Sequence, residues 1–236
     1  MMPGTAAIPH RENVPERIRR AAIALFKARG YHGTAIRELA RSVRVEAASL
    51  YYHFPSKQEI LRDVFAHVMD DLLDGLQQVV NDHSRPEERL RAAVQFHVQF
   101  HIERQAEAFI SHSELRSLSG PNLRLTLAQR DRYERMFRAL LVDGIRSGAF
   151  RVRDVPVTAI AILTMCSGVS DWFSSHGRLS ATAVAEIYAD MVLQLLSAGG
   201  SVAPRRRSWS RSRRSGASIP RQPGPARPSP GVDSSR

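Results

Sequence analysis

Residues 46–60 read EAASLYYHFPSKQEI, so that three small side chains precede two tyrosines, a histidine, a proline and a lysine. A short helix is predicted over 47–52, and Pro55 ends it because proline cannot continue the backbone hydrogen-bond ladder. The following SKQE predicts a new helix with a capping box, in which Ser56 bonds forward and Glu59 bonds back. The stretch therefore places a short helix between two clear helix boundaries.

Two further helices are predicted before this one. The segment from Glu16 to Gly30, ERIRRAAIALFKARG, repeats apolar residues at helical spacing and ends at a glycine. A second helix begins after Thr34, which is a good N-cap. Since only the link VRVE, residues 43–46, separates this helix from 47–52, the pair predicts a helix-turn-helix supported by the first helix.

The side chains of this helix-turn-helix suit contact with DNA. A recognition helix must bring its backbone close to base edges in a major groove about 12 Å wide, so small residues leave room for that approach. Hydroxyl, imidazole and ammonium groups can donate hydrogen bonds to phosphates, and a helix N-terminus favours an anion. The small residues are Ala47, Ala48 and Ser49, and the phosphate donors are Tyr51, Tyr52, His53 and Lys57. The alternative is an ordinary helical hairpin with solvated polar ends.

Basic charge gathers at the two ends of the chain, whose formal net charge is +11. Residues 1–57 hold ten Lys or Arg against four Asp or Glu, and residues 199–236 hold nine against one, whereas residues 58–198 hold 15 against 18. A polyanionic partner is therefore expected for the ends. Residues 1–13 and the Arg/Ser/Pro-rich tail, 199–236, are predicted to be disordered. The tail is either solvated without a specific role or a salt-dependent phosphate contact.

The middle of the chain is also predicted to be helical. Apolar residues recur three and four apart, and alternating runs of β type are missing. Together with the N-terminal helices this makes an all-α protein of about nine helices. The helices expected after residue 56 are one to about residue 80, one opened by Pro86, and others over 107–118, 122–147, 155–175 and 181–197.

Composition bounds the location and the chemistry of the protein. No run of about 18 apolar residues is present and the N-terminus lacks an apolar segment long enough for a secretory signal, so a cytoplasmic protein without a membrane partner is expected. Cys166 is the single cysteine, which excludes an intrachain disulfide and a CxxC metal cluster and suggests a small buried residue. No cofactor is indicated.

His97 and His101 lie four residues apart, the spacing at which two imidazoles on one helical face can share a metal, with His112, Glu103 or Glu107 as further ligands. No HExxH motif or cysteine pair accompanies them, so pocket or surface histidines are the preferred interpretation and no metal site is predicted. Adjacent Ser and His residues on a helix point apart and no GxSxG motif is present, so the chain is predicted not to be an enzyme.

The segment from Val14 to about Phe65 resembles the N-terminal DNA-binding domain of the TetR family of bacterial repressors. The hallmark of that family is a small-residue recognition helix running into Leu-Tyr-x-His-Phe, then Ser-Lys and Glu or its equivalent. The matching residues here are Leu50, Tyr51, His53, Phe54, Ser56, Lys57 and Glu59. The resemblance implies a DNA-binding domain over 14–60 and a helical ligand-binding and dimerisation domain over 61–198.

Carried over by position, the resemblance implies further DNA contacts. Thr34 and Ala35 would meet a phosphate at the start of the second helix, and Arg37 would reach a base or the backbone. Arg44 departs from the pattern, because the family usually has glycine at this turn position. The turn therefore requires either a left-handed arginine or a different geometry. An arginine there would also gain a phosphate contact.

The resemblance also implies a homodimer whose C-terminal helices enclose a pocket. The last two helices are apolar around most of their surface, as a four-helix bundle with a second copy requires. The expected interface residues are Ile160, Leu163, Ser167, Ile187, Tyr188, Met191 and Leu195. The residues expected to line the pocket are Phe96, Phe100, Phe109, Met136, Phe137, Met165 and Trp172. For either group, a place in the core of one chain is the alternative.

The preferred interpretation is a transcriptional regulator, a repressor that leaves a palindromic operator on binding a small apolar molecule. The C-terminal half is loosely similar to TetR regulators of fatty-acid and steroid catabolism, which suggests an acyl-CoA effector. The arginines considered for its phosphates are Arg116, Arg124, Arg130 and Arg132. The alternatives are a nucleoid-type DNA binder that depends on the tail, a helical enzyme, and an activator.

Overall fold

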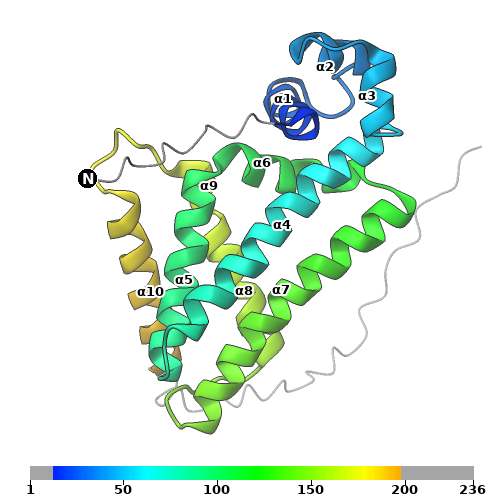
Figure 1. The fold of residues 1–236 in the computed structure, drawn as a ribbon. Coiled ribbons are helices and arrows are strands. Elements are labelled where there is room, and N and C mark those ends of the chain that lie inside the picture. Colours follow the sequence, from blue (N-terminus) through cyan, green and yellow to red (C-terminus); the bar gives the residue numbers. More distant parts are fainter. Residues whose placement is uncertain (1–12, 198–236) are drawn as a thin grey trace, which may run out of the picture. The chain divides into compact units, whose positions relative to one another are not determined.

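The structure, a computed structural model, describes residues 13–197, which fold into helices joined by short loops (Figure 1). Strands are absent from these residues, so the prediction of an all-α protein is confirmed. The ends predicted to be disordered lie outside the described residues, apart from Asn13.

Helix α1, Val14–Arg29, is capped at both ends by its own sequence. The side-chain oxygen of Asn13 accepts a hydrogen bond from the N–H of Glu16 at 3.0 Å, and the Glu16 carboxylate accepts from the N–H of Asn13 at 3.1 Å. These bonds satisfy donors that the start of a helix leaves open. Gly30 ends the helix with a φ of 72°, which glycine adopts without steric cost.

Helices α2, Ile36–Ser42, and α3, Ala47–His53, form the predicted helix-turn-helix pair. The expected N-cap at Thr34 is wrong by one residue, because the cap is Ala35, whose N–H donates to the carboxylate of Glu38 at 3.3 Å. The hydroxyl of Thr34 instead donates at 2.9 Å to the carbonyl of the glycine that ends α1. Thr34 therefore holds the loop between α1 and α2.

Helix α4, Lys57–Asn81, carries the chain from the helix-turn-helix into the rest of the protein (Figure 1). The hydroxyl of Ser56 accepts from the N–H of Glu59 at 3.1 Å, so the forward half of the predicted capping box is confirmed. The backward half is replaced, because the Glu59 carboxylate accepts from Asn122 at 2.8 Å and from Arg62 at 3.0 Å. The helix continues without interruption across the boundary expected between the two domains.

The remaining described helices follow the predicted order, with two interruptions. The helix expected over 107–118 divides into an α-helix and a 3-10 turn at Glu114, and the helix expected over 155–175 divides at Gly168. The segments are α5 Pro86–Glu103, α6 Gln105–Ser113, η1 Leu115–Ser117, α7 Gly120–Arg146, α8 Val155–Ser167, α9 Val169–Trp172 and α10 Ala181–Ser197.

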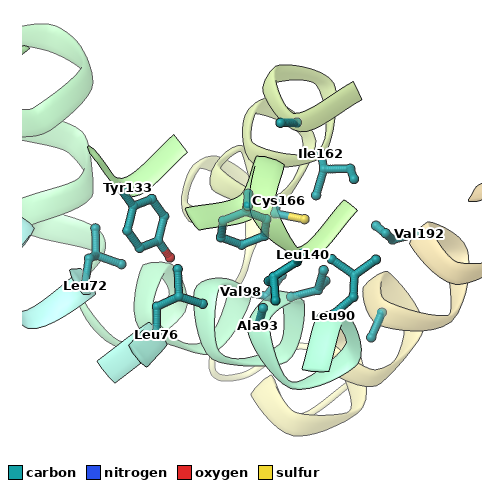
Figure 2. Packing of buried hydrophobic residues seen from close by; sticks show 14 of the residues in the cluster. Leu72, Leu76, Leu90, Ala93, Val98, Tyr133, Leu140, Ile162, Cys166 and Val192 are labelled. Carbon is teal, nitrogen blue, oxygen red and sulfur yellow. The ribbon is translucent and has the colours of Figure 1, made fainter. Parts of the chain in front are cut away.

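Two hydrophobic cores meet along α4. The first core joins α1, α2 and α3 to the start of α4. It also contains Ile110 of α6 and Leu118, which follows η1. The second joins the rest of α4 to α5, α7, α8 and α10, and Figure 2 shows Cys166 among its side chains. Burying one Leu, Ile or Phe side chain contributes about 1.5–3 kcal/mol, so each core stabilises its own part of α4.

Close packing in the second core depends on two glycines. A Cβ on Gly75 of α4 would lie 2.3 Å from the ring of Phe96 on α5, and a Cβ on Gly144 of α7 would lie 1.8 Å from the ring of Phe150. Neither ring could stay in place against a larger residue. Cys166 is buried in the same core, where burial raises the pKa of its thiol to about 12 and keeps it protonated.

Candidate functional sites

The helix-turn-helix presents most of the predicted DNA-contacting residues to solvent. Tyr52 is 85% exposed and its ring lies edge-on to that of His53, with 5.2 Å between centroids. Leu50 is fully buried and anchors α3 in the first core. The exposed members of the predicted set are Ala35, Arg37, Arg44, Ala48, Ser49, Tyr51 and Tyr52. The less exposed members are Thr34, Ala47, His53 and Lys57.

The turn between α2 and α3 is built with a left-handed arginine. Arg44 has a φ of 56°, and among the described non-glycine residues it alone has a positive φ. Its N–H donates to the carbonyl of Arg41 at 3.1 Å, and the next N–H, of Val45, donates to that of Ala40 at 3.0 Å. The guanidinium of Arg17 on α1 donates to the carbonyl of Val43. The turn therefore has the left-handed backbone that glycine usually provides. Because the residue is an arginine, its Cβ makes this backbone conformation strained.

Lys57 is not fully free to meet a phosphate. Its ammonium lies 4.2 Å from the centroid of the Tyr31 ring, a cation–π contact. Burial lowers the pKa of Lys57, and the nearby carboxylate of Glu114 opposes that shift. The same carboxylate accepts from the N–H of Tyr31 at 3.1 Å and from the hydroxyl of Ser117 at 2.7 Å.

The side-chain amide of Gln58, like the carboxylate of Glu114, contacts both the loop after α1 and the segment after α6. Its nitrogen donates to the hydroxyl of Tyr31 at 3.0 Å and to the carbonyl of Ser117 at 2.7 Å, while its oxygen accepts from the N–H of Ser119 at 3.2 Å. Gln58 and Glu114 therefore join the loop after α1 to the loop between α6 and α7. Sequence reasoning missed both residues, because no local pattern marks contacts between residues this far apart in the chain.

A cavity of about 260 Å³ lies between α4, α5, α6, α7 and α8. Its apolar lining is contributed by Phe65, Val68, Met69, Leu72, Phe100, Ala108, Leu127, Ile160 and Leu163. Its polar lining is contributed by His97, His101, Ser111, His112, Arg130, Asp131, Tyr133, Glu134, Thr164 and Ser167. An apolar lining with a few converging polar groups is typical of sites for small molecules.

Both ring nitrogens of His97 have hydrogen-bond partners in the cavity wall. The Nδ1 of His97 lies 2.9 Å from the hydroxyl of Tyr133, and the Nε2 lies 3.0 Å from the hydroxyl of Ser167. Burial, with a smaller contribution from His101, lowers the pKa of His97 well below its usual range, while burial raises that of Tyr133 well above its own. Both groups are therefore neutral near pH 7.

His101 follows His97 one turn later on α5, with 4.2 Å between their ring centroids, and is 8% exposed. Its Nδ1 lies 2.9 Å from the carbonyl oxygen of His97. Burial lowers the pKa of His101 to about 4, so its imidazole is neutral near pH 7. His112 of α6 and Arg130 of α7 line the same cavity.

Of the residues expected to line a pocket, Phe100 lies in the cavity wall and the other six lie elsewhere. Phe137 is fully buried in the second core, which Phe96, Met136 and Met165 pack against. Phe109 and Trp172 are 44% and 56% exposed. Large apolar side chains indicate burial, but their spacing does not say which side of a helix faces a cavity.

The residues expected at a dimer interface divide between the cavity and the surface. Ile160, Leu163 and Ser167 of α8 line the cavity. On α10, Ile187, Met191 and Leu195 repeat every four residues and are 45%, 43% and 66% exposed. Tyr188 stacks on Trp172 with 6.5 Å between centroids.

Helix α8 is unusually apolar for its exposure. Val157 and Ile160 are 62% and 49% exposed. The segment Val155–Trp172 is long and apolar enough to cross a membrane by length and composition alone, a weak criterion that helices of soluble proteins also meet. Ile160 also lines the cavity, so α8 contributes both to the cavity wall and to this exposed apolar surface. Among residues 13–197 no group of three His, Cys, Asp or Glu residues is arranged to hold a metal ion.

Comparisons with known proteins agree with this geometry. Residues 18–64 match the family described as bacterial regulatory proteins, tetR family, and residues 83–196 match the tetracyclin repressor-like C-terminal domain. The TetR-family regulator PfmR from Thermus thermophilus is 32% identical, with a TM-score of 0.69 over 75% of this chain and 97% of that chain. The chain belongs to the TetR family and is a DNA-binding transcriptional regulator.

Two relatives bear on the kind of regulator. The transcriptional repressor KstR2 of Mycolicibacterium smegmatis is 28% identical over 175 residues, which are 73% of this chain and 85% of that protein. AibR, whose structure was solved with isovaleryl coenzyme A and operator DNA, is 28% identical, with a TM-score of 0.67 over 77% of this chain and 98% of that chain.

The strain at Arg44 predicts an unusual stability change. The substitution Arg44→Gly should raise the free energy of unfolding by about 0.5–1 kcal/mol, because glycine accepts a positive φ without steric cost. Arg44→Ala removes the same side chain but keeps the strain, so it should bring no such gain. Urea unfolding of both variants beside the wild type measures this. Equal stabilities for the two variants would contradict the left-handed turn.

The depressed pKa of His101 predicts acid sensitivity. The unfolded chain takes up a proton near pH 6.5 while folded His101 stays neutral to about pH 4, so stability is full above pH 6.5 and falls between these values. His101 should account for a loss of about 1 kcal/mol between about pH 7.5 and about pH 5.5. In the variant His101→Gln, which does not titrate, urea unfolding should show a shallower dependence on pH. An unchanged slope would refute the assignment.

Proposed function

We propose that this chain is a homodimeric repressor that binds a palindromic operator and leaves it when a small, largely apolar molecule occupies the cavity. The observation that carries the proposal is the bridge from the cavity to the helix-turn-helix. Ala108, Ser111 and His112 of α6 line the cavity, and Glu114, directly after α6, binds the backbone of Tyr31.

Movement of α6 would be passed on to the DNA-binding helices. Ile110 of α6 and Leu118 after η1 are buried in the first core together with α1, α2 and α3. Gln58 ties the same segment to the start of α4. A ligand that pushes on α6 would therefore change the position of the helix-turn-helix. The free energy available for this change equals the difference between the ligand's binding free energies for the operator-binding and the released conformations.

The effector class follows from the cavity and from the relatives. A volume of about 260 Å³ is below that of most drug-sized sites, so it takes a small molecule or the acyl end of a larger one. The complex of AibR with isovaleryl coenzyme A supports an acyl-CoA thioester as the first class to test. Of the four arginines considered for its phosphates, Arg130 lines the cavity.

The exposed apolar faces of α8 and α10 support dimerisation through these helices. Contiguous exposed apolar surface on a soluble protein usually marks an interaction site, and two such helices from each copy would form a four-helix bundle. In this arrangement the two recognition helices would reach successive major grooves about 34–36 Å apart. Location in the cytoplasm is part of the same proposal, since the operator lies there.

The operator is the main test of this function. Full-length protein and a chain ending at Ala198 should both select the same palindromic fragment from a genomic library at about 150 mM salt, where non-specific binding is weak. On that fragment, Arg44→Gly and Arg44→Ala should both lower the affinity and reduce the salt dependence by about one phosphate contact. Selection that needs residues 199–236 would favour a nucleoid-type binder instead.

Isothermal titration with acyl-CoA thioesters of increasing length tests the effector class.

The dimer is tested by charge on the α10 surface. The double substitution Ile187→Asp and Met191→Asp should convert the dimer to monomer, because each carboxylate would be buried without a partner. Leu125→Asp on α7 is a matched control, since Leu125 is 56% exposed and lies on neither helix of the proposed interface. Sedimentation velocity measures the mass. A double variant that stays dimeric would exclude this interface.

A further inference from the structure

The tautomer of His101 follows from its hydrogen bond to α5. The carbonyl oxygen of His97 can only accept, so the Nδ1 of His101, 2.9 Å away, must carry the proton and donate it. A neutral imidazole holds one ring proton, which leaves Nε2 with a free lone pair. This atom makes no hydrogen bond to any residue in the described part of the chain, although the side chain is only 8% exposed.

Three polar groups beside His101 in the wall, on α5, α7 and α8, are engaged with one another, whereas the ring of His112 on α6 stacks on that of His101 with 6.4 Å between centroids. His97 uses both ring nitrogens, one with Tyr133 and one with Ser167. Tyr133 is 4% exposed, and the hydroxyl of Ser167 lies against the imidazole. Of the ring nitrogens of His97 and His101, Nε2 of His101 is therefore the one without a partner among residues 13–197.

We propose that His101 Nε2 recognises the effector by accepting a hydrogen bond from a hydroxyl or N–H group on an otherwise apolar molecule. The inference rests on the proposed function, in that it takes the cavity as the effector site. Positioning is strict, because the protonated Nδ1 is held by the helix backbone and fixes the ring. The apolar body of the molecule would lie against Phe65, Leu72 and Phe100.

The alternatives for this atom fit less well. A ligand with only acceptor oxygens would find no donor at Nε2, because the ring proton is on Nδ1. A metal ion needs further ligands, and no suitable group of three exists among residues 13–197. No buried side-chain nitrogen or oxygen lacks a partner in the described residues, so Nε2 is accessible from the cavity. A ligand that displaces water from Nε2 without donating to it leaves the acceptor unpaired, so this one atom discriminates between molecules of the same shape.

The test uses two probes that differ by one hydroxyl group, 2-naphthol and naphthalene. A cavity of about 150 Å³ lined by apolar residues takes benzene, so a fused pair of rings suits this one. Equilibrium dialysis against the full-length wild type, with the free probe measured by chromatography, should show about tenfold tighter binding of 2-naphthol. Equal affinities, or no binding of either probe, would overturn the proposal.

Two substitutions separate recognition from shape. His101→Phe keeps a ring but removes the acceptor. The affinity of this variant for 2-naphthol should be about tenfold below that of the wild type and equal to its affinity for naphthalene. His101→Gln offers an amide oxygen close to the position of Nε2 and should keep most of the preference. A preference that survives His101→Phe would overturn the proposal. Unfolding curves confirm that both variants fold.

A spectroscopic measurement reports on the atom itself. In protein labelled with 15N-histidine, Nε2 of His101 should give the shift of an unprotonated imidazole nitrogen, and only 2-naphthol should move it. A protonated Nε2, or equal shifts with both probes, would refute the assignment. Since no DNA is present in these experiments, failure to find an operator would not affect their result. An operator found alongside a negative probe result would overturn the role of His101 alone.

Discussion

The structure depends on one constraint, which is that α4 belongs to two hydrophobic cores at once. Its first turns are buried with α1, α2 and α3, and its later turns are buried with α5, α7, α8 and α10. A helix of this kind cannot shift at one end without disturbing the packing at the other, since interiors are close-packed. Helix α4 therefore connects the DNA-binding helices to the cavity. The contacts of Gln58 and Glu114 make a second connection between them.

Features that depend on neighbours in the sequence could be predicted. The all-α fold, the helix-turn-helix, the stop at Pro55 and the forward cap at Ser56 all follow from local rules of helix formation. The corrections to these predictions are small: the N-cap of α2 is Ala35, one residue after Thr34, and the helix expected over 107–118 divides at Glu114. The left-handed turn at Arg44 was one of two options, which came from the family resemblance, because the family usually has glycine at that position.

The cavity could not be predicted to the same degree, because it depends on contacts between distant segments. Phe100 was the expected residue that lies in its wall, whereas Phe96 fills the space beside Gly75, an approach that no pattern in α5 reveals. The spacing of histidines 97 and 101 marks them in the sequence, and the structure places both in the cavity wall. The partners of His97, Tyr133 and Ser167, lie 36 and 70 residues away in the chain, and nothing local connects them.

In the proposed dimer, helix α8 would take part in both the cavity wall and the interface. Ile160 of this helix lines the cavity and is half exposed. A molecule filling one cavity would thus press on a wall shared with the neighbouring subunit. In such a dimer, binding at one site would change the affinity of the other, and operator release would depend on the coupling free energy between the two sites.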